Sequence, residues 1–468
     1  MIGGVLLVNV VAALVGYALV FPGRRSVVTT LSYLGLAILL GTGAIFAVLG
    51  VLAPFGLRIG LGAFLVVAAA LCVLGLALRR RLHWSLDERP APAPRTLLED
   101  AVVTISGFGL VALGAIALVG AFRSVPWLDD TWYFWLPKGR ALDLIGLDPS
   151  LWRPDPHFIA SYGDGQETLR FIRPDNPLWF SMLLERVVPS GARFDFRPAN
   201  VEMAVLLVSF VGASARLLWG RVRPALLLPA LLLVFAAPEL LRQAQGGAAD
   251  VPLAIYLALA LLAAAGWLAE RGPVALVLLA VFGSAAVAIK TEGLFELPLF
   301  LAILSLFTWR AGRALLPLWA VCAGAVATLV PWLVWRSLHG VSNVFSIRDA
   351  LSPSYLADRT GLLRSAADIL GHDLTSIRQW SLILPLTVIL GAAAALRDRR
   401  IVWLAPATGL LAAYALFVWV SWADPEGSFR LIASAYRYVT PPLVTAGVFL
   451  PILAEKTLGA ARQRAAKT

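Results

Sequence analysis

The chain has 468 residues, of which 59% are hydrophobic and 14% charged, with a formal net charge of +11 at pH 7. An ordinary soluble domain is roughly half apolar and a quarter charged, so this composition excludes a water-soluble globular protein and indicates a membrane protein. The Lys and Arg residues stand in short clusters between apolar runs rather than on one continuous basic face, which argues against a nucleic-acid partner.

The apolar runs predict an all-α polytopic fold with about thirteen transmembrane helices. Each run is about 17 to 25 residues long, enough for a helix to cross the hydrocarbon core of a bilayer. The predicted spans are residues 2–21, 27–52, 59–78, 101–122, 200–219, 224–241, 251–269, 273–289, 294–309, 315–335, 380–396, 401–422 and 439–453.

Basic residues on alternate turns predict the orientation of these spans. Cytoplasmic loops carry an excess of Lys and Arg, so the turns with the clusters are expected in the cytoplasm. The clusters are Arg24 and Arg25, Arg79 to Arg81, Arg221 and Arg223, Arg271, Arg310 and Arg313, and Arg397 to Arg400. The N-terminus is then outside and the C-terminus inside, in a plasma (inner) membrane.

The spans and breaks predict a division of the chain. Three leading spans (residues 1–82) and a Pro-rich cytoplasmic linker (83–100) precede a membrane core (101–453), and a basic cytoplasmic tail follows (454–468). The core has a long outer loop (123–199), which we expect to carry function because loops commonly do. Within it, "PDNPLWFSMLLERVV" is too short and too charged to span, so we expect an interfacial helix.

The stretch "WLDDTWYFWLPKGRAL" places two adjacent carboxylates, Asp129 and Asp130, at about headgroup depth, with Lys138 and Arg140 shortly after them. Two neighbouring carboxylates in a partly dehydrated place raise each other's pKa, and such a group can accept a proton from a hydroxyl. The alternative is that an Asp caps the helix that begins at "TWYFW". Both interpretations remain open.

Asp250, in "QGGAADVPLAIY", stands at the outer start of a span with Pro252 in the first turn. This is a common way to begin a helix, so capping is the simpler interpretation. In a compact bundle, however, the same position faces the loop of Asp129 and Asp130.

Two further charged groups lie at the outer ends of spans. Lys290 and Glu292, in "VAIKTEGLF", join two short spans, and Arg437 and Tyr438, in "SAYRYVTPPL", precede the last one. Lys290 is either a snorkelling side chain loosely paired with Glu292 or a cation for a lipid-linked phosphate. Arg437 and Tyr438 are likewise either an interfacial anchor or part of a phosphate site.

No cofactor motif accompanies these groups. The sequence has no glycine-rich nucleotide loop and no His-Glu-x-x-His, and its four histidines are far apart. The two cysteines, Cys72 and Cys322, each lie inside an apolar run. We therefore predict neither a cofactor nor a metal, although a divalent ion stays possible.

The ordered set of an outer "DD" with "WLPKGRAL", then "PDNPLWFSMLLE", "AADVPLAIY", "AIKTEGL" and "RYVTPP" resembles the GT-C class of polytopic glycosyltransferases. The likeness is to bacterial members related to protein mannosyltransferases and lipid A aminoarabinose transferases, and it covers residues 101–453. No single motif is specific, and the order of the set carries the resemblance.

The resemblance implies an inverting transfer of a sugar from a polyprenyl-phosphate donor to a glycan, lipid or protein acceptor on the outer face. It implies a catalytic role for Asp129 and Asp130, phosphate binding by Lys290 and Arg437, and a supporting role for Asp250. The aromatic residues Trp132, Trp135 and Trp179 would then flank a sugar ring or prenyl chain; the alternative is that they belong to the interfacial aromatic belt and have no such role.

The chain also departs from the family. Three spans and a linker precede the core, the second acidic position is Asp rather than the Glu of several relatives, and there is no large soluble outer domain. Two rivals remain: a transporter or flippase for a lipid-linked saccharide, which predicts repeats and broken helices near the bilayer centre, and a glycan polymerase or ligase that depends on basic groups.

Overall fold

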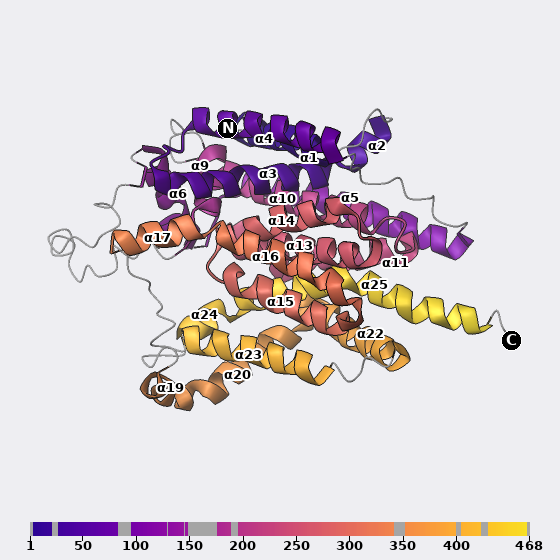
Figure 1. Ribbon diagram of the computed structural model, residues 1–468. Coiled ribbons are helices and arrows are strands. Elements are labelled where there is room, and N and C mark those ends of the chain that lie inside the picture. The colour runs from indigo at the N-terminus through magenta and orange to yellow at the C-terminus, as the bar shows by residue number, and fades with distance from the viewer. Residues whose placement is uncertain are drawn as a thin grey trace.

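The computed structural model describes residues 3–20, 27–82, 95–128, 130–144, 146–147, 176–188, 195–340, 352–398, 404–422 and 429–465. These residues form an all-helical bundle in which the long helices lie roughly side by side (Figure 1). No β-strand occurs in this described part of the chain. The all-α, membrane-embedded architecture predicted from composition is confirmed.

The first half of the bundle contains the helices α1 (Gly3–Val20), α2 (Val27–Ser32), α3 (Leu34–Leu52), η1 (Ala53–Phe55), α4 (Leu61–Leu82), α5 (Leu97–Arg123), η2 (Thr131–Trp135), α6 (Leu136–Leu144), α9 (Trp179–Val187), α10 (Arg197–Leu218), α11 (Pro224–Phe235), α12 (Pro238–Gly246) and α13 (Asp250–Glu270).

The second half contains α14 (Pro273–Ile289), α15 (Gly293–Phe307), η4 (Trp309–Ala314), α16 (Leu315–Ala327), α17 (Val330–Leu338), α19 (Pro353–Arg359), η5 (Thr360–Leu362), α20 (Leu363–Thr375), α21 (Ile377–Trp380), α22 (Ile383–Asp398), α23 (Leu404–Trp422), α24 (Phe429–Tyr438) and α25 (Thr440–Ala465).

Helices lie on every predicted span, but their lengths differ. Among the described residues, 8 helices are long and apolar enough to cross a membrane, and a bent pair brings the number to 9. Shorter apolar helices of 10–17 residues occupy the predicted spans 273–289, 294–309, 380–396 and 401–422. The full count of thirteen stays a prediction.

The predicted span 224–241 is not continuous. Helix α11 ends at Phe235, and α12 starts at Pro238 with a bend of 52° between the two. Proline has no amide hydrogen and disfavours helical backbone in the residue before it. Ala237 is accordingly extended, with φ −61° and ψ 116°. The single-helix prediction for this stretch is therefore wrong.

The centre of the bundle is α13, whose residues are buried along most of its length. Tyr256 of α13 donates its hydroxyl to the carbonyl of Leu39 at 3.0 Å, and its ring meets Trp179 edge-on at 5.2 Å. One residue thus joins α13 to a leading span and to α9.

The leading spans pack backbone against backbone. A Cβ on Gly16 would lie 2.0 Å from the Ala37 carbonyl oxygen, and one on Gly41 would lie 1.8 Å from that of Ala12. Such an approach requires glycine. Helix α3 in turn packs against α10 and α14, so the leading spans lie directly on the rest of the bundle.

A buried polar pair also joins α1 to α10. The amide nitrogen of Asn9 donates to Glu202 Oε2 at 2.6 Å and to the carbonyl of Val5 at 2.9 Å. Glu202 is fully buried, and its Oε1 and the Asn9 Oδ1 have no hydrogen-bond partner among the described residues.

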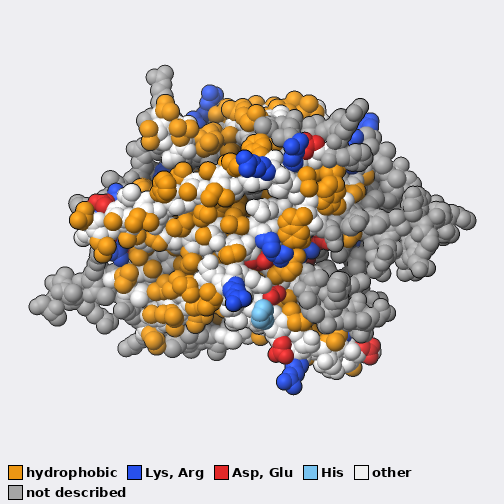
Figure 2. All heavy atoms as spheres, turned by 180° about the vertical axis from the view of Figure 1, so that it is seen from behind, with side chains coloured by type: hydrophobic (Ala, Val, Ile, Leu, Met, Phe, Trp, Pro, Cys, Tyr) orange, Lys and Arg blue, Asp and Glu red, His pale blue; other side chains and the backbone are white. Residues whose placement is uncertain are grey.

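The outward faces of several helices are apolar. Figure 2 shows hydrophobic side chains over much of the rear face, and on α5 the side chains of Ile105 and Phe108 are 70% and 75% exposed. Large apolar surfaces of this kind are unfavourable in water and are typical of lipid-facing helices.

Helix α9 forms where "PDNPLWFSMLLERVV" predicts a helix, but it does not lie on the bundle surface. Trp179, Phe180 and Leu183 are buried, and α9 packs against α1, α3 and α6. The apolar face predicted to enter the lipid headgroups is covered by protein instead. Trp179 and Trp135 are fully buried in packing, so neither is free to flank a sugar, whereas Trp132 is partly exposed.

Candidate functional site

Four segments that are far apart in the sequence bring charged side chains together at one end of the bundle. Asp130 precedes η2, Asp250 begins α13, Lys290 and Glu292 form the turn between α14 and α15, and Arg437 lies in α24. We call these five residues the charged cluster and this end of the bundle the site end. Asp129 lies outside the described residues.

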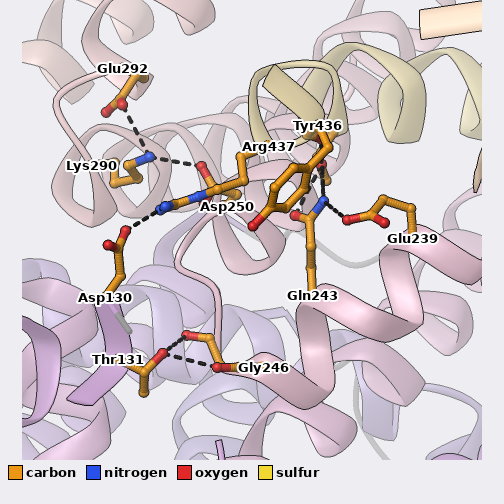
Figure 3. Close-up of polar contacts among 12 residues, drawn as sticks. Asp130, Thr131, Glu239, Gln243, Gly246, Asp250, Lys290, Glu292, Tyr436 and Arg437 are labelled. Carbon is orange, nitrogen blue, oxygen red and sulfur yellow. Dashed lines mark hydrogen bonds and ion pairs between the residues drawn. The ribbon is translucent and has the colours of Figure 1, made fainter. Parts of the chain in front are cut away.

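Arg437 bridges two aspartates in the charged cluster (Figure 3). Its Nη1 lies 2.5 Å from Asp130 Oδ2, and its Nε donates to Asp250 Oδ2 at 2.7 Å. The guanidinium therefore joins the segment after α5 to the start of α13. Nitrogens fixed in one plane suit this contact better than a single ammonium would.

Lys290 makes the second bridge. Its Nζ lies 2.7 Å from Asp250 Oδ1 and 3.0 Å from Glu292 Oε1. Asp250 thus binds a different cation with each carboxylate oxygen. Only 4% of the Asp250 side chain and 7% of the Lys290 side chain are exposed, so these charges interact with little screening by water.

The structure decides between the alternatives for Asp250 and Lys290. Asp250 is the first residue of α13, but no side-chain cap closes that helix start, and its carboxylate binds Lys290 and Arg437 instead. The capping interpretation of Asp250 is wrong. Lys290 is buried and doubly paired, so the snorkelling interpretation is wrong as well. Asp130 likewise makes no capping bond to η2.

The charge of the cluster is unbalanced. Three carboxylates, those of Asp130, Asp250 and Glu292, surround two cations, Lys290 and Arg437. Burial works against the charged ammonium of Lys290, but Asp250 and Glu292 outweigh it and raise the pKa of Lys290 above its usual value. Lys290 therefore stays protonated at neutral pH.

The backbone beside Asp130 is held by a glycine turn. Thr131 donates its hydroxyl to the carbonyls of Gly246 and Gly247 at 3.0 and 2.9 Å. Gly247 has φ +78°, and a Cβ there would lie 2.9 Å from Thr131 Oγ1. Only glycine meets both conditions without strain, so this turn fixes the segment of Asp130 close to the start of α13.

Lys138 is fully buried and is linked to the turn of Lys290 through Asn176. Its Nζ donates to the Asn176 carbonyl at 2.5 Å and sits 5.4 Å from the centre of the Trp332 ring. The Asn176 side chain reaches Thr291, next to Lys290, at 3.5 Å. Sequence reasoning missed Asn176, although it lies within the quoted "PDNPLWF".

Arg140 points to a different neighbour. It binds Glu185 of α9 at 3.1 Å, and 41% of its side chain is exposed. Burial raises the pKa of Glu185, although the hydrogen bond and charge of Arg140 oppose this. The partner that Arg140 binds belongs to α9 and is not one of the five residues of the charged cluster.

Tyr438 closes one side of the cluster. The Lys290 ammonium lies 5.9 Å from the centre of its ring, and its backbone carbonyl accepts a hydrogen bond from Tyr414 at 3.0 Å. Tyr414 also donates to Glu296 at 2.6 Å. Glu296 stands one helical turn beyond Glu292, and this spacing on α15 is the sequence signal that would have identified it.

The comparisons with known proteins add nothing to this geometry. No family model, curated protein or solved structure matches the chain. Within the described residues, no group of three or more His, Cys, Asp or Glu side chains is placed to hold a metal ion.

Proposed function

We propose that the chain transfers a sugar from a polyprenyl-phosphate donor to a glycan, lipid or protein acceptor, as its resemblance to GT-C glycosyltransferases implies. The observation that carries the proposal is the position of Arg437 between Asp130 and Asp250, with Lys290 beside them. This arrangement places a carboxylate that can act as a base next to two cations that can bind a phosphate.

The cations suit the chemistry of this donor. A sugar phosphodiester carries one negative charge, and the polyprenyl phosphate that leaves acquires a second as the glycosidic bond breaks. Arg437 and Lys290 would then bind the transition state more strongly than the ground state, which is the requirement for catalysis. Tyr438, Glu292 and Lys138 would shape the phosphate pocket around them.

The ion pair of Asp130 suggests an exchange. When a donor phosphate binds Arg437, it competes with Asp130, whose carboxylate is released close to the anomeric carbon. Asp130, or its neighbour Asp129, then takes the proton from an acceptor hydroxyl. The acceptor oxygen forms its bond to the anomeric carbon as the bond to the phosphate oxygen breaks, and attack from the opposite side inverts the configuration.

The proposal also places the site end on the extracytoplasmic face. Nucleotide sugars are cytoplasmic, so an enzyme outside needs a sugar carried through the membrane on lipid. Arg221, Arg223 and Arg271 lie at the opposite end of α10 and α13 from Asp250, as the positive-inside rule favours for a cytoplasmic end.

The test is sugar transfer by purified protein in lipid nanodiscs, with a panel of polyprenyl-phosphate hexoses and pentoses and a mixture of glycan and lipid acceptors. Release of polyprenyl phosphate is measured for wild type, Asp129→Asn, Asp130→Asn and a control, Arg221→Gln. We expect the control to match wild type and at least one aspartate variant to lose about 100-fold or more. Transfer at the wild-type rate by both aspartate variants would exclude the acid pair as the base.

A flippase for a lipid-linked saccharide is the second candidate, and one observation favours it. The break between α11 and α12 bends a membrane span by 52°, and broken helices are common in transporters. A flippase would move a fluorescent polyprenyl-phosphate sugar between leaflets of a proteoliposome without releasing polyprenyl phosphate, which separates the two functions.

A further inference from the structure

The short helix α12 contacts the segment that carries Asp130. The amide of Leu128 donates to the Gly246 carbonyl at 3.3 Å, and the Thr131 hydroxyl donates to the carbonyls of Gly246 and Gly247. These contacts lie on both sides of Asp130 in the sequence. The C-terminal end of α12 therefore holds this segment close to the charged cluster.

The middle of α12 contacts the segment that carries Arg437. Gln243 is fully buried, and its Nε2 donates to the Tyr436 carbonyl at 3.3 Å and to Thr440 Oγ1 at 2.9 Å. Figure 3 shows Gln243 between Glu239 and Tyr436. Helix α12 thus binds the chain on both sides of Arg437 as well.

One side chain of α12 contacts both segments. The Arg242 guanidinium lies 5.2 Å from the ring of Trp127 and 4.5 Å from the ring of Tyr436. Trp127 comes shortly before Asp130, and Tyr436 directly precedes Arg437. Glu239 fixes the guanidinium through two hydrogen bonds of 2.8 and 2.7 Å. Arg242 therefore connects the segment that carries Asp130 to the segment that carries Arg437.

We propose that Arg242 is a positioning residue that sets the distance between Asp130 and Arg437. The inference rests on the proposed function only for its effect on catalysis, because the contacts themselves are independent of the reaction. Arg242 does not touch the cluster. It acts through Trp127 and Tyr436, and α12 supplies the rigid support through Glu239 and Gln243.

The role needs a guanidinium. A planar group can contact two aromatic rings while its nitrogens bind both oxygens of one carboxylate, whereas a lysine ammonium makes a single point contact. Arg242→Lys keeps the charge and most of the length but loses this geometry. We therefore expect Arg242→Lys to behave like Arg242→Gln rather than like wild type.

A structural test follows backbone hydrogen exchange in nanodiscs in peptides covering η2 and α24. For Arg242→Gln and Arg242→Lys we expect exchange about tenfold faster in both regions. The matched control is Arg221→Gln, which removes a similarly two-pronged pair with Glu270, at 2.6 Å for each bond, from the opposite end of α13. Unchanged exchange in both regions for the Arg242 variants would overturn the inference.

A kinetic readout separates positioning from general stability. Both Arg242 variants should lower the kcat for sugar transfer at least tenfold with little change in KM. Arg221→Gln should lower the unfolding temperature by a similar amount but leave kcat unchanged. Equal kcat values in the Arg242 and Arg221 variants would contradict the role in catalysis. If exchange rises as expected but wild type releases no polyprenyl phosphate, the proposed function fails and the positioning role stands.

Discussion

Lys290 and Asp250 form a buried ion pair, with 2.7 Å between Lys290 Nζ and Asp250 Oδ1, although 40 positions separate them in the chain. Two charges removed from water are costly unless each has a close partner. Arg437 and Glu292 provide the further partners, so the stability of the site end depends on the whole charged cluster rather than on one pair.

The first prediction concerns the central carboxylate. Asp250→Asn removes the one carboxylate that contacts both Lys290 and Arg437, and breaking a buried pair costs about 3–5 kcal/mol. Thermal unfolding in detergent should show a large drop in midpoint. The control is Glu270→Gln, which breaks an exposed ion pair. Such a pair contributes at most about 1 kcal/mol to the free energy of unfolding. Similar midpoints for the two variants would mean that burial does not strengthen the cluster.

The turn at Gly247 gives a second prediction. Gly247→Ala combines a positive φ with a close approach to Thr131, whereas Gly340→Ala has φ +65° and open space around the new Cβ. Each substitution costs about 1–2 kcal/mol for the left-handed backbone. We expect Gly247→Ala to lower the unfolding temperature further and to reduce sugar transfer, which Gly340→Ala leaves intact. Identical effects would show that the Thr131 contact adds nothing.

The buried pair between α1 and α10 leads to a third prediction. A carboxylate without a cation is costly inside a membrane span, and within the part of the chain that the structure describes no donor reaches Glu202 Oε1 or Asn9 Oδ1. Glutamine offers an N–H in place of one oxygen, so Glu202→Gln should unfold at the same temperature as wild type or higher. Glu202→Ala should lose about 2–4 kcal/mol, from the cavity and from the one Asn9 N–H that loses its acceptor. A Gln variant as unstable as the Ala variant would refute this interpretation.

The fourth prediction concerns pH. The folded-state pKa of Lys290 is raised, so its contribution to stability is complete below the unfolded pKa of about 10.4 and is lost as pH rises through the folded value. The difference in unfolding midpoint between wild type and Lys290→Met should therefore be constant from about pH 6 to 9 and shrink only at higher pH. A difference that shrinks near pH 7 would mean that the Asp250 and Glu292 carboxylates do not hold this proton.

The sequence predicted the helical membrane architecture well because hydrophobic length alone identifies spans. It also selected Asp130, Asp250, Lys290, Glu292 and Arg437, since charges at the ends of apolar runs are rare and expensive. It did not show which of these side chains pair. That depends on how α13, α15 and α24 meet, and a residue such as Asp250 satisfies the pattern for a helix cap equally well.

The sequence was less informative where packing overrides a local pattern. Helix α9 has the amphipathic character of an interfacial segment, but protein covers its apolar face. Arg242 directly follows the predicted span 224–241, and only the break before Pro238 gives α12 its own direction. The local pattern of apolar residues predicts neither the covered face of α9 nor the direction of α12.

The most direct test of the account is binding of polyprenyl phosphate to purified protein, measured by thermophoresis in detergent. We predict that Arg437→Gln and Lys290→Met each weaken binding about tenfold or more, as expected when a charged hydrogen bond to phosphate is lost, while Arg221→Gln binds like wild type. Folding of each variant is checked by circular dichroism. Unchanged affinity in folded Arg437→Gln and Lys290→Met would show that the charged cluster does not hold the lipid phosphate.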